Sequence, residues 1–223
     1  MAQSLTSLIQ GFLRFFFQHL YTDLAYLYDT VAWSSSMGQW RQWQSAMLID
    51  FRPGIILELG HGPGYGQLDL NRAGQTTFAL DPSPQMNRLA KRRLRKSGYR
   101  ADILCGRAQS LPFRNGSFSG VVSSFPSEYI MDPETLQETW RVLQPGGSLT
   151  IVGIVEITGK SLPDRFANWL YNITGQSGSI PEHWVEIFRK YRFSPRLEQV
   201  QMARARVTRV VAVRASTDHA VDP

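Results

Sequence analysis

The chain has 223 residues, of which 43% are hydrophobic and 19% charged, and it carries a net charge of +6. This length and composition are typical of one globular domain with a substantial core, and they exclude a chain that is disordered throughout. The single cysteine, Cys105, excludes an internal disulfide and a cysteine metal cluster and suits a reducing compartment. The four histidines show no ligand spacing, so no metal site is expected.

A helix is predicted between residues 4 and 27, where apolar residues recur in steps of three and four. Arg14, His19 and Asp23 interrupt the pattern before it reaches a bilayer-spanning length, and the features of a signal peptide are lacking. Two interpretations remain open: a lid packed over the ligand cleft, or an anchor that dips the phenylalanines at 12 and 15–17 into an anionic membrane surface. Residues 1–45 are therefore expected to form an N-terminal helical cap.

Residues 55–66 read Ile-Ile-Leu-Glu-Leu-Gly-His-Gly-Pro-Gly-Tyr-Gly, a short apolar strand that runs into a glycine-rich turn, with Glu58 just before it. Glycine permits positive φ and lets a ligand approach the main chain, and the helix that follows offers free N–H groups. The dinucleotide fingerprint G-x-G-x-x-G would need glycine at Tyr65 or Gln67, so it does not fit. The next apolar run ends at Asp81, about 20 residues on, where Rossmann-like units place an acid that binds ribose hydroxyls.

The Glu-x-Gly-x-Gly-x-Gly pattern resembles motif I of the class I S-adenosylmethionine (SAM) dependent methyltransferases. Four later segments resemble further motifs of that family in the same order. They are the strand end at Asp81, residues 106–113 (Gly-Arg-Ala-Gln-Ser-Leu-Pro-Phe), 117–125 and 138–147 (Glu-Thr-Trp-Arg-Val-Leu-Gln-Pro-Gly-Gly). Tyr28-Asp29 and the segment 36–43 resemble the N-terminal region of ubiquinone and menaquinone C-methyltransferases, with Ala32 in place of that group's asparagine.

The resemblance and the alternation of strands and helices predict an α/β fold. We expect a Rossmann-like three-layer sandwich with a mostly parallel seven-stranded sheet and a C-terminal antiparallel hairpin. The methyltransferase domain is expected over residues 46–214, with a lid insertion near 157–181 and a tail at 215–223. Strands are predicted at 54–59, 75–80, 101–105, 120–124, 148–155, 197–202 and 207–213, and helices at 65–72, 84–96, 133–143 and 181–191.

The resemblance implies SAM as the cofactor. Glu58 is expected to orient the ammonium group of SAM, Asp81 to accept from both ribose hydroxyls, and Pro82 and Met86 to flank the adenine. The other residues expected to bind the cofactor are Tyr28, Gly60, His61, Gly62, Gly64, Arg107, Ala108 and Ser124. Arg107 stands where the family commonly has an aspartate, and its guanidinium can donate to the adenine but cannot accept from it.

The methyl acceptor is expected at the carboxyl ends of the fourth and fifth strands, where residues such as Trp33, Phe125 and Trp169 would form an aromatic lining. Such a lining favours a small hydrophobic or lipid acceptor, for example a quinol ring or a phospholipid amine. Glu128, Tyr129 and His183 are the candidate catalytic residues. For methylation at carbon, Glu128 or His183 would remove a proton.

Two functions are compatible with these patterns. One is a cytoplasmic SAM-dependent methyltransferase, either free or peripheral on the inner face of the membrane. The other is a non-catalytic SAM-binding or membrane-associated accessory protein, which the departures from the family pattern at Arg107 and Ser119 would allow. The basic run at 88–100 predicts either a solvated outer helix or contact with an anionic surface, and no nucleic-acid motif accompanies it. The sequence does not indicate an oligomeric state.

Overall fold

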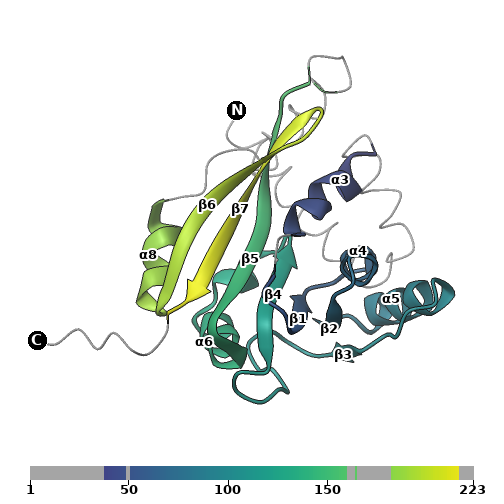
Figure 1. Ribbon diagram of the computed structural model, residues 1–223, viewed down its shortest axis with the longest axis horizontal. Helices are drawn as coiled ribbons and strands as arrows, with labels where there is room; N and C mark the ends of the chain where they lie inside the picture. The colour runs from purple at the N-terminus through teal and green to yellow at the C-terminus, as the bar shows by residue number, and fades with distance from the viewer. Residues whose placement is uncertain (1–37, 49–50, 160–163, 165–181, 216–223) are drawn as a thin grey trace, which may run out of the picture.

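The computed structural model describes residues 38–48, 51–159, 164 and 182–215. Its centre is a seven-stranded sheet in the order β3-β2-β1-β4-β5-β7-β6 (Figure 1). The strands are β1 (Ile55–Leu59), β2 (Thr76–Asp81), β3 (Ile103–Cys105), β4 (Phe118–Ser124), β5 (Leu143–Ile157), β6 (Phe193–Gln201) and β7 (Ala205–Arg214). Strands β1 to β5 are mutually parallel, and β7 runs antiparallel to both β5 and β6. The predicted mostly parallel sheet with an antiparallel C-terminal hairpin is confirmed.

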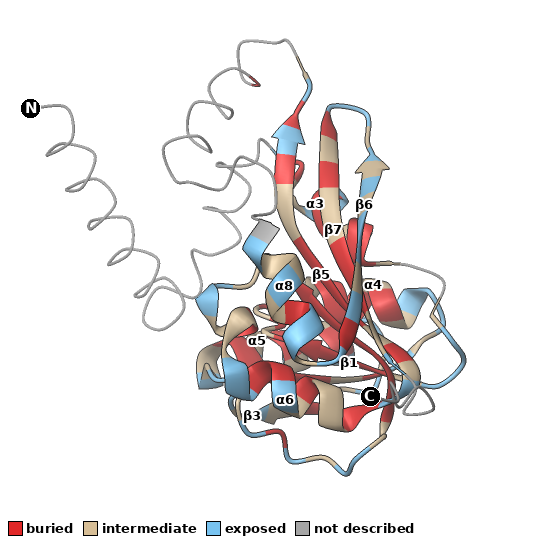
Figure 2. Ribbon diagram, turned by 90° about the vertical axis from the view of Figure 1, so that its left-hand side faces the viewer, coloured by how far each residue is buried: buried red, intermediate tan, exposed pale blue. Residues whose placement is uncertain are grey.

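Helices cover both faces of the sheet and make the predicted three layers (Figures 1 and 2). One face carries α3 (Trp40–Gln44), the 3-10 turn η2 (Ser45–Met47), α4 (Tyr65–Arg72) and α5 (Pro84–Lys96). The other face carries α6 (Pro133–Val142) and α8 (Glu182–Lys190), and the 3-10 turn η3 (Glu128–Met131) joins β4 to α6. The bounds of α4 and α5 agree with the prediction at both ends, whereas β5 is longer than the predicted 148–155.

Strand β1 lies at the centre of the sheet and is buried between the two helical layers. Leu57 and Leu59 pack in the same cluster as Leu136 of α6 and Phe188 of α8. Ile56 belongs to the cluster on the opposite face, with α3, η2 and α4. Because side chains alternate along a strand, Glu58 follows Ile56 and carries its carboxyl group into this second, largely apolar layer.

The strand order reverses at β1, which pairs with β2 on one side and with β4 on the other. Leu59 lies beside Leu80, and Glu58 lies beside both Ala79 and Val122. The carboxyl ends of these three parallel strands therefore meet at one edge. Open α/β sheets bind their ligands at such a switch point.

Several sequence-based predictions fall outside the described residues. They concern the N-terminal helix at 4–27, Tyr28, Trp33, Trp169, most of the region 157–181 and the tail beyond residue 215. Of the region 157–181, residues 157–159 and Asp164 are described, and the Asp164 carboxylate accepts from Arg204 at 2.5 Å. Within the described ranges, no helix is long and apolar enough to cross a membrane.

Candidate functional site

The turn after β1 depends on glycine for two physical reasons. Gly60, Gly62 and Gly64 have φ values of +66°, +54° and +83°, in the left-handed region that L side chains rarely adopt. In addition, a Cβ on Gly64 would lie 2.6 Å from the Cβ of Ala90, so α5 could not pack against the turn. The glycine spacing therefore serves both the conformation of the turn and the close approach of α5.

Asp81, at the end of β2, lies directly against this turn. Its Oδ2 accepts from the Gly62 N–H at 2.9 Å, and its Oδ1 accepts from the Ser83 N–H at 2.8 Å. Only 7% of the residue is exposed. A carboxylate oxygen has more than one lone pair, so each oxygen of Asp81 can also accept from a ligand hydroxyl. The carboxylate thus supports the glycine turn in addition to its predicted role at the ribose.

His61, inside the turn, is buried and held by the protein on both ring nitrogens. Nδ1 lies 2.7 Å from the Gly62 carbonyl oxygen, and Nε2 lies 3.1 Å from Oδ1 of Asn87. The Asn87 Nδ2 donates to the carbonyl oxygens of Asp81 and Ser83 at 2.9 and 2.7 Å. These contacts join the turn to α5 and give His61 a structural role.

Glu58 carries the most perturbed carboxyl group of the site. Its side chain is fully buried, and within the described part of the chain neither carboxyl oxygen has a hydrogen-bond partner. A Cβ on Gly66 would collide with Oε1. Burial raises the pKa of Glu58 to about 8; the neighbouring Gln67 side chain lowers it by less, and the charges of Asp81 and Asp69 raise it further. The carboxyl group is therefore mainly protonated at neutral pH.

Two arginines enclose Tyr65, which begins α4 directly after the turn. The Arg93 guanidinium lies 3.6 Å from the centre of the Tyr65 ring and donates to the Pro63 carbonyl, and Arg41 lies 4.9 Å from the same ring. Arg41 also pairs with Asp69 at 2.9 Å. These contacts of Tyr65 were not predicted, because no sequence pattern distinguishes Arg93 from the other cations of α5.

The remaining cofactor-binding predictions that lie in the described part of the chain fall at the same edge of the sheet. Pro82 and Arg107 are exposed, whereas Met86 and Ala108 are buried. Ser124, the last residue of β4, is buried, and its Oγ accepts from Gln44 Nε2 at 3.2 Å. Gln44 was not predicted as a residue of the site, because nothing in its local sequence pattern indicates this contact.

Of the three catalytic candidates, the structure brings Tyr129 to the glycine turn, because a Cβ on Gly60 would collide with the Tyr129 hydroxyl. Glu128 is exposed at the start of η3. His183 is exposed on α8, which packs against β6. Among the residues that the structure describes, no group of three or more histidine, cysteine, aspartate and glutamate side chains could hold a metal ion.

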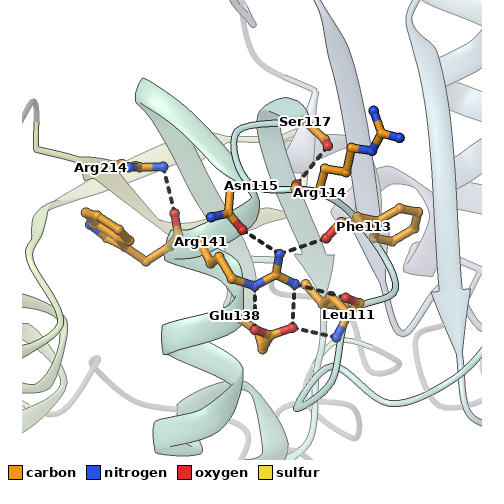
Figure 3. Close-up of polar contacts among 9 residues, drawn as sticks. Leu111, Phe113, Arg114, Asn115, Ser117, Glu138, Arg141 and Arg214 are labelled. Atoms are coloured by element: carbon orange, nitrogen blue, oxygen red, sulfur yellow. Dashed lines mark hydrogen bonds and ion pairs between the residues drawn. The ribbon is translucent and has the colours of Figure 1, made fainter.

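A further cluster joins α6 to the loop that carries Arg107 and Ala108 (Figure 3). The Arg141 guanidinium grips both carboxylate oxygens of Glu138 at 2.6 and 2.7 Å and donates to the carbonyls of Phe113 and Leu111. Glu138 Oε2 also accepts from the Leu111 N–H at 2.7 Å. The bond from Arg141 lowers the pKa of Glu138. This pair was not predicted, although the i,i+3 spacing of Glu138 and Arg141 on a predicted helix could have indicated it.

The comparison with known proteins decides the family. Residues 57–151 match the family model described as Methyltransferase domain. A demethylmenaquinone methyltransferase of Renibacterium salmoninarum is 29% identical over 184 residues, covering 79% of this chain and 76% of the relative. The chain contains a methyltransferase domain at residues 57–151. The family predicted from the sequence is therefore confirmed, and with it the cofactor class.

Other relatives of this methyltransferase are matched over shorter stretches. A demethylmenaquinone methyltransferase of Paenarthrobacter aurescens is 34% identical over 136 residues, which cover 59% of this chain and 52% of the relative. A mitochondrial 2-methoxy-6-polyprenyl-1,4-benzoquinol methylase of Leishmania donovani is 28% identical over 52% of this chain and 41% of its own length. The chain thus spans about half the length of several of the curated relatives that it matches.

Solved structures show the same fold as this methyltransferase. Phosphoethanolamine N-methyltransferase 2 of Haemonchus contortus, bound to S-adenosylhomocysteine, has a TM-score of 0.60 at 18% identity, covering 85% of this chain and 58% of that chain. Geranyl diphosphate C-methyltransferase of Streptomyces coelicolor has a TM-score of 0.58 at 12% identity, covering 78% of each chain.

Proposed function

We propose that this methyltransferase transfers the methyl group of SAM to a ring carbon of a hydrophobic quinol. The observation that carries the proposal is the glycine turn after β1, with the Asp81 carboxylate bound to the Gly62 N–H at 2.9 Å. The choice of acceptor is supported by the relatives named for demethylmenaquinone and benzoquinol methylation. The rival expectation, a non-catalytic accessory protein, is not favoured, since the reported relatives are named as methyltransferases or methylases.

The proposed reaction is an in-line displacement at the methyl carbon. The ring carbon forms the new bond to the methyl group while the carbon–sulfur bond breaks and its electron pair stays on sulfur. The ring carbon then loses its proton, which leaves the methylated quinol and neutral S-adenosylhomocysteine. SAM supplies the leaving group, so the protein chiefly has to hold the two carbons in line.

Aromatic side chains beside the end of β4 support an apolar acceptor. The Trp40 and Phe125 rings lie 4.4 Å apart between centroids, and Trp40 also contacts Trp43 edge-on. Phe125 has a φ of +48°, which is unusual for a residue other than glycine, and its N–H donates to the Val152 carbonyl at 2.6 Å. Glu128 follows shortly after this turn and is our candidate for the base that accepts the proton.

Incubation of the purified protein with SAM and a reduced naphthoquinol that lacks the ring methyl group tests the proposal. We expect the methylated quinol by mass spectrometry, with no methylation of phosphoethanolamine supplied in parallel. Asp81→Ala is expected to weaken SAM binding by about 1.5–3 kcal/mol in calorimetry, because a hydrogen bond to a charged group is lost. Exposed Glu134→Ala serves as the control. A protein that binds neither SAM nor S-adenosylhomocysteine would contradict the proposal.

The charge of helix α5 supports a second part of the proposal, that the enzyme acts at a membrane surface, where hydrophobic quinols reside. Its buried residues Met86, Asn87, Ala90 and Leu94 face the protein. The helix contains no acidic residue. Five of its cations form no ion pair within the described ranges, and all are at least partly exposed: Arg88, Lys91, Arg92, Arg95 and Lys96. We propose that this basic α5 face contacts anionic lipid headgroups. The predicted insertion of the N-terminal phenylalanines lies outside the described residues.

Sedimentation with vesicles measures the contribution of the basic α5 face. The protein is expected to pellet with vesicles that contain phosphatidylglycerol, less so as salt rises, and not with phosphatidylcholine alone. Replacing Arg88, Arg92 and Arg95 by glutamine should weaken binding about 100-fold, at about 1 kcal/mol per cation. A control with Arg114, Arg189 and Lys190 replaced removes the same charge from exposed positions elsewhere. Equal losses in the two variants would contradict a specific role of α5.

A further inference from the structure

Tyr129 occupies a defined position above the first glycine of the turn. Gly60 has a φ of +66°, and the Cζ of Tyr129 lies 3.4 Å from the position that a Cβ on Gly60 would take. The Tyr129 hydroxyl lies still closer to that position. Since Gly60 directly follows β1, the phenol oxygen lies at the carboxyl end of β1, where the glycine turn begins.

The hydrogen bonds of Tyr129 have a direction that Ser123 imposes. Ser123 is fully buried on β4, and its Oγ donates to the Leu59 carbonyl at 2.8 Å. The Tyr129 hydroxyl oxygen lies 3.0 Å from the same Oγ. A serine hydroxyl has one proton, and Ser123 gives it to Leu59. The bond between Ser123 and Tyr129 is therefore donated by the tyrosine.

This direction determines what the tyrosine can do for a ligand. Because its only hydroxyl proton is given to Ser123, the phenol oxygen can act toward a ligand only as an acceptor. SAM carries two cationic groups, the methionine ammonium and the sulfonium with its polarised methyl group. Both are attracted to an oxygen that accepts.

We propose that the Tyr129 hydroxyl oxygen accepts from a cationic group of SAM above Gly60, and that Ser123 is the positioning residue that keeps the tyrosine in this accepting orientation. The inference rests on the proposed function, since it takes SAM as the ligand. It replaces the expectation that Tyr129 acts as an acid or base on the acceptor. If the sulfonium is the group bound, the site should prefer SAM over S-adenosylhomocysteine, because the sulfur of S-adenosylhomocysteine is neutral.

The other acids described at this edge of the sheet, Asp81 and Glu58, make different contacts. Both oxygens of Asp81 hold backbone N–H groups of the turn and of Ser83. The Glu58 carboxyl lies beneath Gly66, on the α4 side of the sheet. Tyr129, by contrast, lies over Gly60 itself. The turn at Phe125, with its φ of +48°, begins the segment that leads to η3 and brings Tyr129 back over β1.

Calorimetric titration of the full chain with SAM and with S-adenosylhomocysteine tests this inference. Tyr129→Phe removes only the oxygen and is expected to weaken SAM binding about 10-fold. Ser123→Ala keeps the phenol but frees its proton, and a loss of SAM affinity is expected there too. Tyr99→Phe, after the end of α5, is the matched control and should bind as the wild type does. Melting temperatures of the variants verify that each one folds.

Comparing the binding of SAM with that of S-adenosylhomocysteine shows which of the two cationic groups Tyr129 contacts. Binding of S-adenosylhomocysteine that stays unchanged in Tyr129→Phe identifies the sulfonium as the partner, and an equal loss for both ligands identifies the ammonium. Wild-type affinity for both ligands in Tyr129→Phe would overturn the inference, as would a lower kcat with unchanged SAM affinity, which would place Tyr129 at the acceptor. Failure of the wild type to bind either ligand would instead contradict the proposed function itself.

Discussion

Replacing Glu58 with glutamine is expected to stabilise the protein at alkaline pH, by about 2–4 kcal/mol near pH 8. The Glu58 carboxyl is fully buried, and burial raises its pKa from 4.5 to about 8. The same carboxyl is ionised above pH 4.5 in the unfolded chain, so folding takes up a proton between pH 4.5 and 8. The free energy of unfolding of the wild type should therefore fall across this window, by about 1.4 kcal/mol per pH unit. Glutamine is similar in shape and uncharged, so the variant should lack this contribution.

Urea unfolding measured at intervals between pH 4.5 and 8 detects the difference. The curves of stability against pH should converge at the acid end and separate as the pH rises. Glu134→Gln, which removes an exposed carboxylate from the first turn of α6, is the control and should run parallel to the wild type. Parallel curves for Glu58→Gln as well would mean that the folded protein does not hold Glu58 protonated.

The same substitution should lower the affinity for SAM if Glu58 helps to orient the ammonium group, as the resemblance to the family implies. A cation that binds beside this group favours its ionised form, so SAM binding should release a proton near neutral pH. A variant that is more stable and binds SAM less well would show a buried acid that is retained for function at the expense of stability. Calorimetry in two buffers of different ionisation enthalpy measures the proton release.

Arg141→Ala is expected to lower the free energy of unfolding by about 2–4 kcal/mol, and the melting temperature by about 5–15 °C. Its guanidinium holds Glu138 with two bonds and also binds the carbonyls of Phe113 and Leu111 and Oδ1 of Asn115 (Figure 3). The substitution removes this donor from two carbonyl groups and from the Glu138 carboxylate, which is 22% exposed. The expected loss in the free energy of unfolding is smaller than for a fully buried ion pair, because solvent screens the partly exposed groups.

Arg114→Ala is the matched control for Arg141→Ala. Arg114 belongs to the same loop region, is exposed, and makes none of the guanidinium contacts that Arg141 makes (Figure 3). Its removal should change stability by less than about 0.5 kcal/mol. Combining Arg141→Ala with Glu138→Gln should cost less than the sum of the two single changes, because both act on one network. Additive losses, or an equal loss in the Arg114 variant, would contradict the proposed role of the network.

The sequence by itself determined the fold class, most elements and the family. Helices α4 and α5 have the predicted bounds, because the glycine turn before α4, Pro84 at the start of α5 and the spacing of apolar residues are local signals. The glycines after β1 were expected to take positive φ, and Gly60, Gly62 and Gly64 do so. Glycine adopts that conformation at no steric cost, so the spacing of the glycines in the sequence predicts the turn even when the surrounding structure is not known.

The tertiary structure alone decided how the side chains of the site are used. Gln44 and Ser124 are 80 residues apart in the chain, and Arg93 reaches the Pro63 carbonyl across 30. The sequence marked Tyr129 as a catalytic candidate, but the collision at Gly60 and the bond to Ser123 indicate an acceptor above the glycine turn. The pKa of Glu58 depends on the packing of Met47 and Gly66 around its carboxyl. Desolvation and hydrogen-bond direction follow from contacts between distant segments, so no local sequence pattern can carry them.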